Sequence, residues 1–516
     1  MSSTTDPAPE PSSDPPADDL EIGPEELALA LRVLGAVASD RALLASVDAA
    51  TRERLQRVAG EVARPGHDQR RRLRKALLRR EREARKARDE ALRRATGIRR
   101  LRDAPAFPTP APPAATGDAG PGTAKPPAGE GPELAEPRKC YVCKAPYRRL
   151  HRFYDQLCPA CGDENLAHRG ASADLRGRVA LVTGARVKIG YQAAILLLRA
   201  GCRVVACTRF PRDAAARYAR EPDFAAWRDR LSIHGVDLRH TPSVEALCHE
   251  LDRSLPRLDF QVHNACQTVR RPPGFYAHLV AGEEGPAPAL PAGAGSLVAR
   301  THGPSPARLS QAPSEADLLL AAPGALEIFP RGVLDQDLQQ VDLRAHNSWR
   351  LTLAEVPTLE LLEVLLVNAT APFVMAARLK PLMLRSAAPP AGTATSGDPA
   401  RHVVMVSAVE GQFYREHKTD RHPHTNMAKA ALNMLVRTSA PDYARDGIHM
   451  NAVDTGWVTD EDPAHLAARK VEEHAFSPPL DVVDGAARIL SPIFDGFRSG
   501  EHASGTFFKD YHPTPW

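Results

Sequence analysis

The chain has 516 residues, which is more than one hydrophobic core usually organises, so we expect several structural units. Its formal net charge of +4 favours neither nucleic acid nor a membrane surface as a partner, so any basic signal must be local. The N-terminus lacks the basic and apolar regions of a secretory signal, and no later uninterrupted apolar run is long enough to cross a bilayer. We therefore expect a soluble cytoplasmic protein.

The first quarter of the chain changes composition twice. Residues 1–23 are acidic and rich in Pro and Ser, which predicts a disordered tail. Residues 24–102 carry apolar side chains at helical spacing and become strongly basic in their second half, which predicts two helices, over residues 24–62 and 70–94. Residues 103–137 are rich in Pro, Ala and Gly and hold too few large apolar groups to offset chain entropy, so they predict a linker.

The basic run from Arg70 to Arg94 allows two interpretations. Lys and Arg side chains on one helix can contact the phosphates of nucleic acid. The run has no aromatic side chain and no recognised DNA-binding motif. We therefore favour a solvated helix or a coiled coil that docks on a protein partner, and nucleic-acid binding stays the weaker hypothesis.

Residues 138–170 contain two CxxC pairs separated by a short segment. In each pair two thiolates can turn toward one ion, and four thiolates close a tetrahedral shell without a position for water. The spacing predicts a small module around one structural zinc ion, held by Cys140, Cys143, Cys158 and Cys161. The metal would supply folding free energy that so short a segment cannot gain by burial. A redox dithiol, an iron centre and chance are the alternatives.

A βαβ unit follows the module. From Gly177 the chain reads GRVALVTGARVKIGYQAAILLLRAGCRVVACTR, an apolar strand, a glycine turn, an amphipathic helix and a second apolar strand. Gly184 and Gly190 would let the backbone approach a pyrophosphate at the N-terminus of this helix. We therefore expect residues 174–516 to form an α/β Rossmann domain with a doubly wound parallel sheet.

The later part of this domain carries further motifs and one interruption. Asp237 and Leu238 end the expected third strand, and the segment HNAC, residues 263–266, ends the fourth. Residues 282–313 are of low complexity, and we expect them to form a disordered insertion, because surface loops lengthen at slowly growing entropic cost.

These motifs resemble those of the short-chain dehydrogenase/reductase family. The family's TGxxxGxG turn is matched by Thr183, Gly184 and Gly190, and its NNAG segment by Asn264 and Ala265. The resemblance spans the chain from about residue 174 to the C-terminus. It implies a Rossmann fold, a nicotinamide dinucleotide as cofactor, and hydride transfer to or from a carbonyl or alcohol.

Three further segments carry the same resemblance. Asn368 in VNATAPF resembles the asparagine of the family's active-site helix, and Lys429 in NMAKAALNML resembles the lysine of its YxxxK motif. Residues 451–459, NAVDTGWVT, are similar to its NxVxPGxxxT segment near the nicotinamide. The resemblance implies dinucleotide contacts from Thr183, Gly184, Arg186, Lys188, Ile189, Gly190, Thr208, Arg209, Asp237, Leu238, Asn264, Ala265, Lys429, Thr455, Gly456 and Val458.

The residues after the second strand predict the form of the dinucleotide. A carboxylate there would bond the ribose 2′-OH of NAD, whereas an arginine accommodates the 2′-phosphate of NADP. This strand ends in Thr208 and Arg209, with Arg186 and Arg212 nearby. We therefore expect NADP rather than NAD. The alternative is that these arginines only cover the surface.

The sequence departs from the family at the site of proton transfer. The resemblance implies a tyrosine that exchanges the proton and a serine that orients the substrate, but these positions hold Thr425 and Ala408. Ser407 aligns with the first serine of the family's pair, and Lys188 replaces the middle glycine of the turn. Because an aliphatic hydroxyl ionises far above a phenol, Thr425 should be a poor general acid at neutral pH.

Another group could supply the proton. His424 adjoins the tyrosine position and histidine titrates near neutrality, so His424 is the first candidate. His422 and Tyr414 are weaker candidates. We therefore expect the catalytic set to be Asn368, Lys429, Thr425 and His424.

The sequence supports two classes of function. The favoured one is an NADP-dependent oxidoreductase of this family with an atypical proton-transfer site. The alternative is a catalytically degenerate NADP-binding sensor or scaffold that acts through its zinc module and basic helix. A homo-oligomer and a protein partner for the N-terminal helices are compatible with both.

Overall fold

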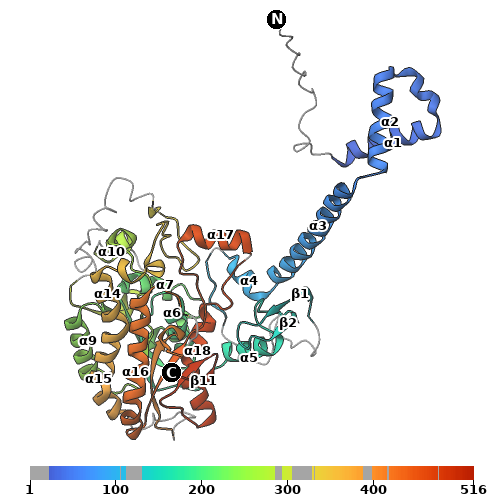
Figure 1. Ribbon diagram of the computed structural model, residues 1–516. Helices are drawn as coiled ribbons and strands as arrows, with labels where there is room; N and C mark the ends of the chain where they lie inside the picture. Colours follow the sequence, from blue (N-terminus) through green and yellow to red (C-terminus); the bar gives the residue numbers. More distant parts are fainter. Residues whose placement is uncertain are drawn as a thin grey trace, which may run out of the picture. The chain divides into compact units, whose positions relative to one another are not determined.

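Figure 1 shows the computed structural model of the chain. It describes residues 23–104, 106–111, 131–284, 293–304, 328–330, 332–386, 398–414, 418–474 and 476–516. The chain divides into two compact units, residues 1–85 and 86–516. The predicted acidic tail lies outside the described residues, apart from Gly23.

The described part of the first unit is helical, as the sequence predicts, but the segment 24–62, expected as one helix, is divided between two helices. It contains α1 (Pro24–Ser39), α2 (Ala49–Ala63) and the beginning of α3 (His67–Arg94). Asp48 caps α2 by accepting a hydrogen bond from the backbone nitrogen of Thr51 at 2.9 Å. Pro65 and Gly66 separate α2 from α3. Residues 67–88 of α3 are exposed to solvent.

The second unit begins with the cysteine-rich module. The strand β1 (Glu133–Lys139) pairs antiparallel with β2 (Pro146–Arg149), and the helix α5 (Pro159–Arg169) follows. The short helix α4 (Gly97–Arg102) packs on this hairpin through Ile98, which is fully buried among the module's apolar residues. The module begins before the predicted residue 138. Its strand β1 starts at Glu133, within the segment 103–137 that the sequence predicts as a linker, and Glu133 already pairs with Arg149 of β2.

A nine-stranded sheet forms the centre of the second unit. Its order is β11-β10-β9-β8-β6-β3-β4-β5-β7, and all neighbours are parallel except β10 and β11. This arrangement confirms the predicted doubly wound fold. The strands are β3 (Val179–Thr183), β4 (Arg203–Thr208), β5 (Leu231–Val236), β6 (Phe260–His263), β7 (Val298–His302), β8 (Arg401–Ser407), β9 (Ile448–Asp454), β10 (Phe507–Lys509) and β11 (His512–Thr514).

Helices cover both faces of the sheet. One face packs against α6 (Lys188–Arg199) and α18 (Val482–Ser499). The other packs against α9 (Thr241–Ser254), α15 (Ala371–Arg385) and α16 (Pro423–Arg445), which lie side by side in Figure 1. The remaining α-helices of the described residues are α7 (Pro211–Tyr218), α8 (Phe224–Trp227), α10 (Ala277–Glu284), α14 (Thr358–Leu365) and α17 (Ala464–His474), and a π-helical turn spans Leu366–Thr370.

The described part of residues 282–313 is not a disordered insertion, contrary to the sequence prediction. Val298–His302 forms β7, which extends the sheet by pairing in parallel with β5. Leu297 is buried in the core. The Nε2 atom of His302 lies 3.4 Å from the Nδ1 atom of His234 on β5. Low complexity hid this strand, because its few apolar residues are spread among polar ones.

Among the described residues, one helical segment has the length and composition of a membrane span. Thr358–Arg385 has 28 residues and is long and apolar enough by length and composition. Its Met375, Leu379 and Leu382 are fully buried against the sheet, and the core helix of a soluble protein meets the same criteria.

Candidate active site

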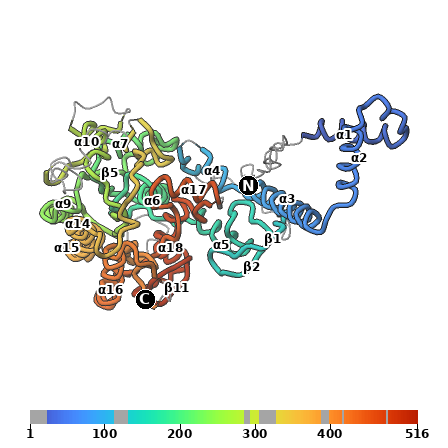
Figure 2. Tube along the Cα trace, turned by 45° about the horizontal axis from the view of Figure 1, so that its top comes forward, coloured from blue at the N-terminus to red at the C-terminus, as the bar shows by residue number. Residues whose placement is uncertain are grey.

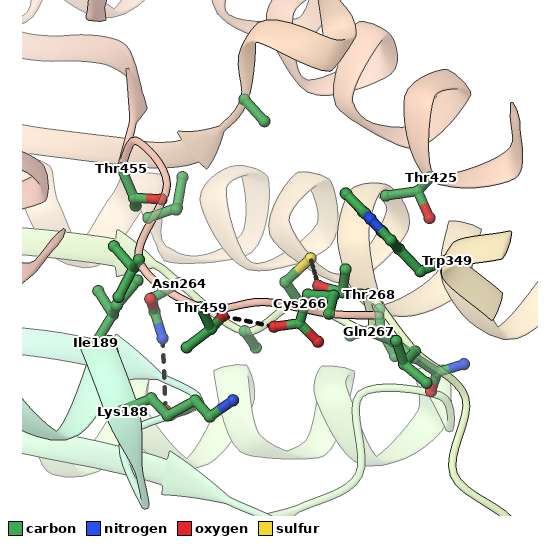
Figure 3. Close-up of a pocket in the computed structure, with 18 of the residues that line it drawn as sticks. Lys188, Ile189, Asn264, Cys266, Gln267, Thr268, Trp349, Thr425, Thr455 and Thr459 are labelled. Atoms are coloured by element: carbon green, nitrogen blue, oxygen red, sulfur yellow. Dashed lines mark hydrogen bonds between the residues drawn. The ribbon is translucent and has the colours of Figure 1, made fainter. Parts of the chain in front are cut away.

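A cavity of about 950 Å³ lies at the carboxyl ends of the parallel strands. Turns after these strands line it with Gly184 after β3, Arg209 after β4, Asn264 after β6, Ala408 after β8 and Thr455 after β9. Ligands of doubly wound sheets bind at this edge, because the loops there diverge around the point where the strand order reverses. Figure 3 shows Lys188 and Thr425 on opposite sides of this cavity.

The turn after β3 requires glycine at two positions. Gly184 has a φ of +68°, and a Cβ there would lie 2.9 Å from the Cα of Ala265. A Cβ on Gly190 would lie 2.3 Å from Nδ2 of Asn264. That Nδ2 donates a hydrogen bond to the backbone oxygen of Thr183 at 3.2 Å. The turn is therefore clamped against the loop after β6, at the N-terminus of α6.

Lys188 keeps the backbone of the glycine that it replaces. Its φ is +55°, a conformation that glycine adopts more readily than other residues. Its Nζ lies 3.9 Å from a carboxylate oxygen of Asp337. Burial by itself would lower the pKa of Lys188, but Glu461 and Asp337 outweigh that effect and raise it. Lys188 is therefore a cation on the floor of the cavity.

Arg209 brings a second positive charge to the cavity. Its guanidinium lies 4.5 Å from the ring centroid of Tyr276. Burial by itself would raise the pKa of Tyr276, but the charge of Arg209 outweighs it and the pKa is lowered. No carboxylate in the described part of the chain forms an ion pair with Arg209. In contrast, Arg186 pairs with Asp213 at 2.8 Å between nitrogen and oxygen.

The lysine and serine positions meet at the end of β8. The Nζ of Lys429, on α16, donates a hydrogen bond to the backbone oxygen of Val406 at 2.8 Å. Ser407 donates to the side-chain oxygen of Asn433 at 2.5 Å, so its hydroxyl is engaged beside the cavity. Thr425 lies one helical turn before Lys429, and its buried Oγ1 has no hydrogen-bond partner among the described residues. A bound molecule could satisfy this hydroxyl.

The four cysteines of the module come together. Their Sγ atoms all lie within 4.8 Å of one another, and those of Cys143 and Cys158 are 3.8 Å apart. The backbone nitrogen of Cys158 donates to the Sγ of Cys140 at 3.3 Å. Zinc is held at about 2.3 Å by each thiolate in such sites. Four sulfurs gathered this closely fit one tetrahedral ion.

Comparison with known proteins identifies the domain around the cavity. Residues 178–276 match the family model described as short chain dehydrogenase, and residues 345–477 match the one described as enoyl-(acyl carrier protein) reductase. An uncharacterized protein, R665 of Acanthamoeba polyphaga mimivirus, is 33% identical over 376 residues, or 69% of this chain and 71% of that protein. The chain belongs to the short-chain dehydrogenase/reductase family.

Named dehydrogenases are matched over shorter segments. Dehydrogenase/reductase SDR family member 13 of Bos taurus is 38% identical over 19% of this chain and 27% of that protein. Retinol dehydrogenase 14 of Homo sapiens is 31% identical over 22% of this chain and 38% of that protein. The chain thus spans well under half of each. Among solved structures, the RhlG/NADP active-site complex of Pseudomonas aeruginosa has a TM-score of 0.40 at 20% identity, over 65% of this chain and 95% of that one.

Most residues that the family resemblance assigned to the dinucleotide line the cavity. Thr183 does not, because it lies behind the turn, where its hydroxyl accepts a hydrogen bond from the backbone nitrogen of Ala265 at 3.0 Å. The others line it: Gly184, Arg186, Lys188, Ile189, Gly190, Thr208, Arg209, Asp237, Leu238, Asn264, Ala265, Lys429, Thr455, Gly456 and Val458. These residues are therefore gathered around one cavity.

Two of the four expected catalytic residues lie behind the cavity. Asn368 accepts a hydrogen bond from the backbone nitrogen of Gln267 at 2.7 Å and so supports a residue that does line the cavity. His424 does not line it either, and its Nε2 lies 3.4 Å from a carboxylate oxygen of Glu360. Successive side chains on a helix point about 100° apart, so His424 faces away from the cavity that its neighbour Thr425 lines. This position does not fit the expected role of proton donor.

The two weaker candidates are placed differently. His422 lines the cavity, and its ring stacks on that of Trp349 with centroids 3.8 Å apart. Its Nδ1 lies 3.1 Å from the side-chain oxygen of Asn426, and burial lowers its pKa to about 4. Tyr414 is 52% exposed and does not line the cavity. His422 is therefore an uncharged lining residue of the cavity at pH 7.

Several lining residues carry no signal in the sequence. Trp349 and Tyr276 come from segments outside the family motifs, and Tyr141 comes from the cysteine module. Nothing in local spacing relates these three positions, because only the folded chain brings them to one surface. Cys266 also lines the cavity (Figure 3), and the sequence does mark it, since it takes the place of the last residue of the NNAG segment.

Proposed function

We propose that the protein is an NADP(H)-dependent oxidoreductase that transfers hydride to or from a carbonyl or alcohol. The observation that carries this proposal is the shared cavity. It joins the glycine turn, with Gly184 and Gly190, to Lys429 on α16 and Thr455 in the loop after β9. A bound dinucleotide needs contacts at both ends of this cavity, because its pyrophosphate and its nicotinamide lie far apart along the sheet edge.

The charge at the β4 end supports NADP over NAD. Arg209 lines the cavity without an ion-pair partner among the described residues, whereas Arg186 is already paired with Asp213. A 2′-phosphate would give Arg209 an anionic partner and gain charge-assisted hydrogen bonds. The 2′-hydroxyl of NAD would leave that charge unmatched. When bound, the dinucleotide supplies the hydride chemistry.

The chain's own residues would orient the reactants. Lys429 carries its charge at the end of β8 and can direct two further N–H donors to the ribose, because its Nζ gives only one to Val406. The free Oγ1 of Thr425 can hold a water or a substrate oxygen by hydrogen bonding. Its high intrinsic pKa makes it an orienting group rather than the proton source. A water held there is the simplest donor.

We also propose that the four-cysteine module holds one structural zinc ion. The gathering of four Sγ atoms within 4.8 Å supports this proposal. Four thiolates would leave the ion no open position, so its role would be to fold the module and not to activate water.

One experiment tests the proposed function. Purified protein is titrated with NADPH and NADH and then screened for oxidation of NADPH by aldehydes and ketones. We expect tighter binding of NADPH and measurable turnover with at least one carbonyl. Binding without any turnover would favour the degenerate sensor, because Thr425 stands where the family has the tyrosine that exchanges the proton. Absence of binding to both dinucleotides would refute the proposal.

A further inference from the structure

The cysteine module is built into the wall of the dinucleotide cavity. Its buried Tyr154 and Leu157 belong to one apolar cluster with Val458, Leu480 and Val482 of the cofactor domain. Ile189, which begins the phosphate-binding helix, packs against the same cluster. Figure 2 shows α5 of the module beside α18. The module therefore touches both the phosphate turn and the loop after β9.

Buried polar contacts fix the module to α18. The hydroxyl of Tyr154 donates to a carboxylate oxygen of Asp484 at 2.6 Å. Arg169 of α5 donates to Asp481 at 2.5 Å and to Asp484 at 2.8 Å. Asp481 caps α18, since its carboxylate also accepts from the backbone nitrogen of Val483 at 2.9 Å. Each of these buried charges is stabilised by its partner across the contact. Movement of the module away from α18 would leave them unpaired, which costs free energy.

One side chain of the module reaches the cavity. Tyr141 lies between Cys140 and Cys143 in the first CxxC pair, and its ring lines the cavity. Its hydroxyl oxygen accepts a hydrogen bond from the backbone nitrogen of Trp457 at 2.9 Å. A phenol that accepts one hydrogen bond keeps its own hydrogen to donate. No residue in the described part of the chain accepts that hydrogen.

We propose that Tyr141 is a ligand-binding residue of the dinucleotide site, supplied by the metal module. Its hydroxyl holds the loop at Trp457 and donates its hydrogen to an acceptor oxygen or nitrogen of the bound dinucleotide at the end near Thr455. This inference rests on the proposed function, because the dinucleotide is its ligand. It assigns the module a role in cofactor binding as well as in folding.

Metal binding and dinucleotide binding are then coupled. The CxxC turn fixes the backbone on both sides of Tyr141, so an ion held by Cys140 and Cys143 also fixes the direction of the phenol. Because binding free energies are linked, loss of the ion weakens dinucleotide binding, and bound dinucleotide strengthens retention of the ion by the same factor. A module that served folding alone would not show this reciprocity once folded.

The test uses the full chain and measures the Kd of NADPH by fluorescence titration. Tyr141→Phe keeps the ring and removes the hydroxyl, so we expect Kd to rise about two- to tenfold, as for one lost hydrogen bond. Tyr147→Phe is the matched control: it removes a hydroxyl of the same module whose bond, to the backbone oxygen of Asp155 at 2.8 Å, stays inside it. We expect Tyr147→Phe to lower the unfolding temperature and leave Kd unchanged.

The coupling is tested with the same readout. Chelation or Cys143→Ser should raise Kd, and Tyr141→Phe should add little once the metal is gone, because both act through the same phenol. An unchanged Kd in Tyr141→Phe, with wild type binding NADPH, overturns this inference and leaves the proposed function standing. Wild type that binds no dinucleotide overturns both. If metal-free protein unfolds, the Tyr141→Phe result decides alone.

Discussion

The guanidinium of Arg209 lies over the ring of Tyr276, 4.5 Å from its centroid, in the cavity where β4 ends. Stacking of this kind holds the charge in place, and a guanidinium has five N–H groups with which it can also donate to an anion. The pair joins a residue from the predicted cofactor motif to one from a segment that no motif marks.

Arg209→Ala should therefore weaken binding of NADPH about ten- to a hundredfold and leave that of NADH nearly unchanged, because only the former has a 2′-phosphate. Both Kd values are measured by titration. Arg212→Ala serves as the control, since Arg212 is close in sequence but does not line the cavity. Equal affinities of wild type for both dinucleotides would contradict the assignment.

Lys429 and Thr425 should behave differently in catalysis. Lys429→Ala should weaken NADPH binding and reduce kcat by about a hundredfold or more, because a cation beside the reacting groups is lost. Thr425→Ala should reduce kcat by about tenfold, as expected for one orienting hydrogen bond. Steady-state kinetics with the best carbonyl substrate decide this. A larger effect at Thr425 than at Lys429 would sink the proposed division of roles.

His424→Gln tests the position of the residue that the sequence favoured as proton donor. Because His424 faces Glu360 behind the cavity, we expect lower thermal stability with kcat nearly unchanged. Loss of turnover without loss of stability would restore it as the donor.

Lys188 combines strain and charge, and two substitutions separate them. Lys188→Gly removes both, whereas Lys188→Ala removes the charge and keeps a side chain at a φ of +55°. Both should weaken NADPH binding to a similar degree. Lys188→Gly should be more stable than Lys188→Ala by up to about 1 kcal/mol, since glycine tolerates this conformation. Denaturant unfolding measures the difference, and equal stabilities would argue against strain at Lys188.

The metal content of the purified chain should be one zinc ion. Elemental analysis should find it in wild type and not in Cys158→Ser together with Cys161→Ser. Among the described residues, His234, Glu250 and His302 form the other group with ligand atoms within 4.8 Å. Zinc that survives the cysteine substitutions and disappears in His234→Ala would place the ion there and refute the cysteine assignment.

His422 should make stability depend on pH. Burial lowers its pKa to about 4 in the folded chain, while an unfolded histidine titrates near about 6.5. Between these values the unfolded chain binds the proton more tightly, so stability is lost as the pH falls from about 6.5 to 4. His422→Gln should reduce that slope by up to about 1.4 kcal/mol per pH unit. Urea midpoints at pH 7, 6 and 5 measure it, with the exposed His465→Gln as control.

The Rossmann fold and many of the residues that line its cavity could be predicted because they depend on short-range patterns. The strand, the turn around Gly184 and the amphipathic helix can each be recognised from consecutive residues. In a parallel sheet the loops after the strands all lie at the carboxyl edge. The family's spacing then placed Asn264, Lys429 and Thr455 on that edge. The strand β7 escaped prediction, because edge strands need few apolar residues and low complexity obscured them.

The proton-transfer site shows the limit of this reasoning. Sequence neighbours such as Thr425 and His424 look equivalent in the printed chain, yet the turn of α16 directs one to the cavity and the other to Glu360. A helix rotates successive side chains by about 100°, so only the packing of α16 on the sheet decides which faces a ligand.

The sequence by itself determined the family, the parallel sheet and the four-cysteine spacing, since each depends on residues a fixed number of positions apart. The tertiary structure alone decided which charges remain available and which elements meet. Arg186 is paired with Asp213, which also pairs with Arg217, while Arg209 forms no ion pair among the described residues. Tyr141 reaches Trp457, more than three hundred residues away in the chain. Such contacts arise from the burial of apolar surface shared between the module and the cofactor domain, which no local pattern records.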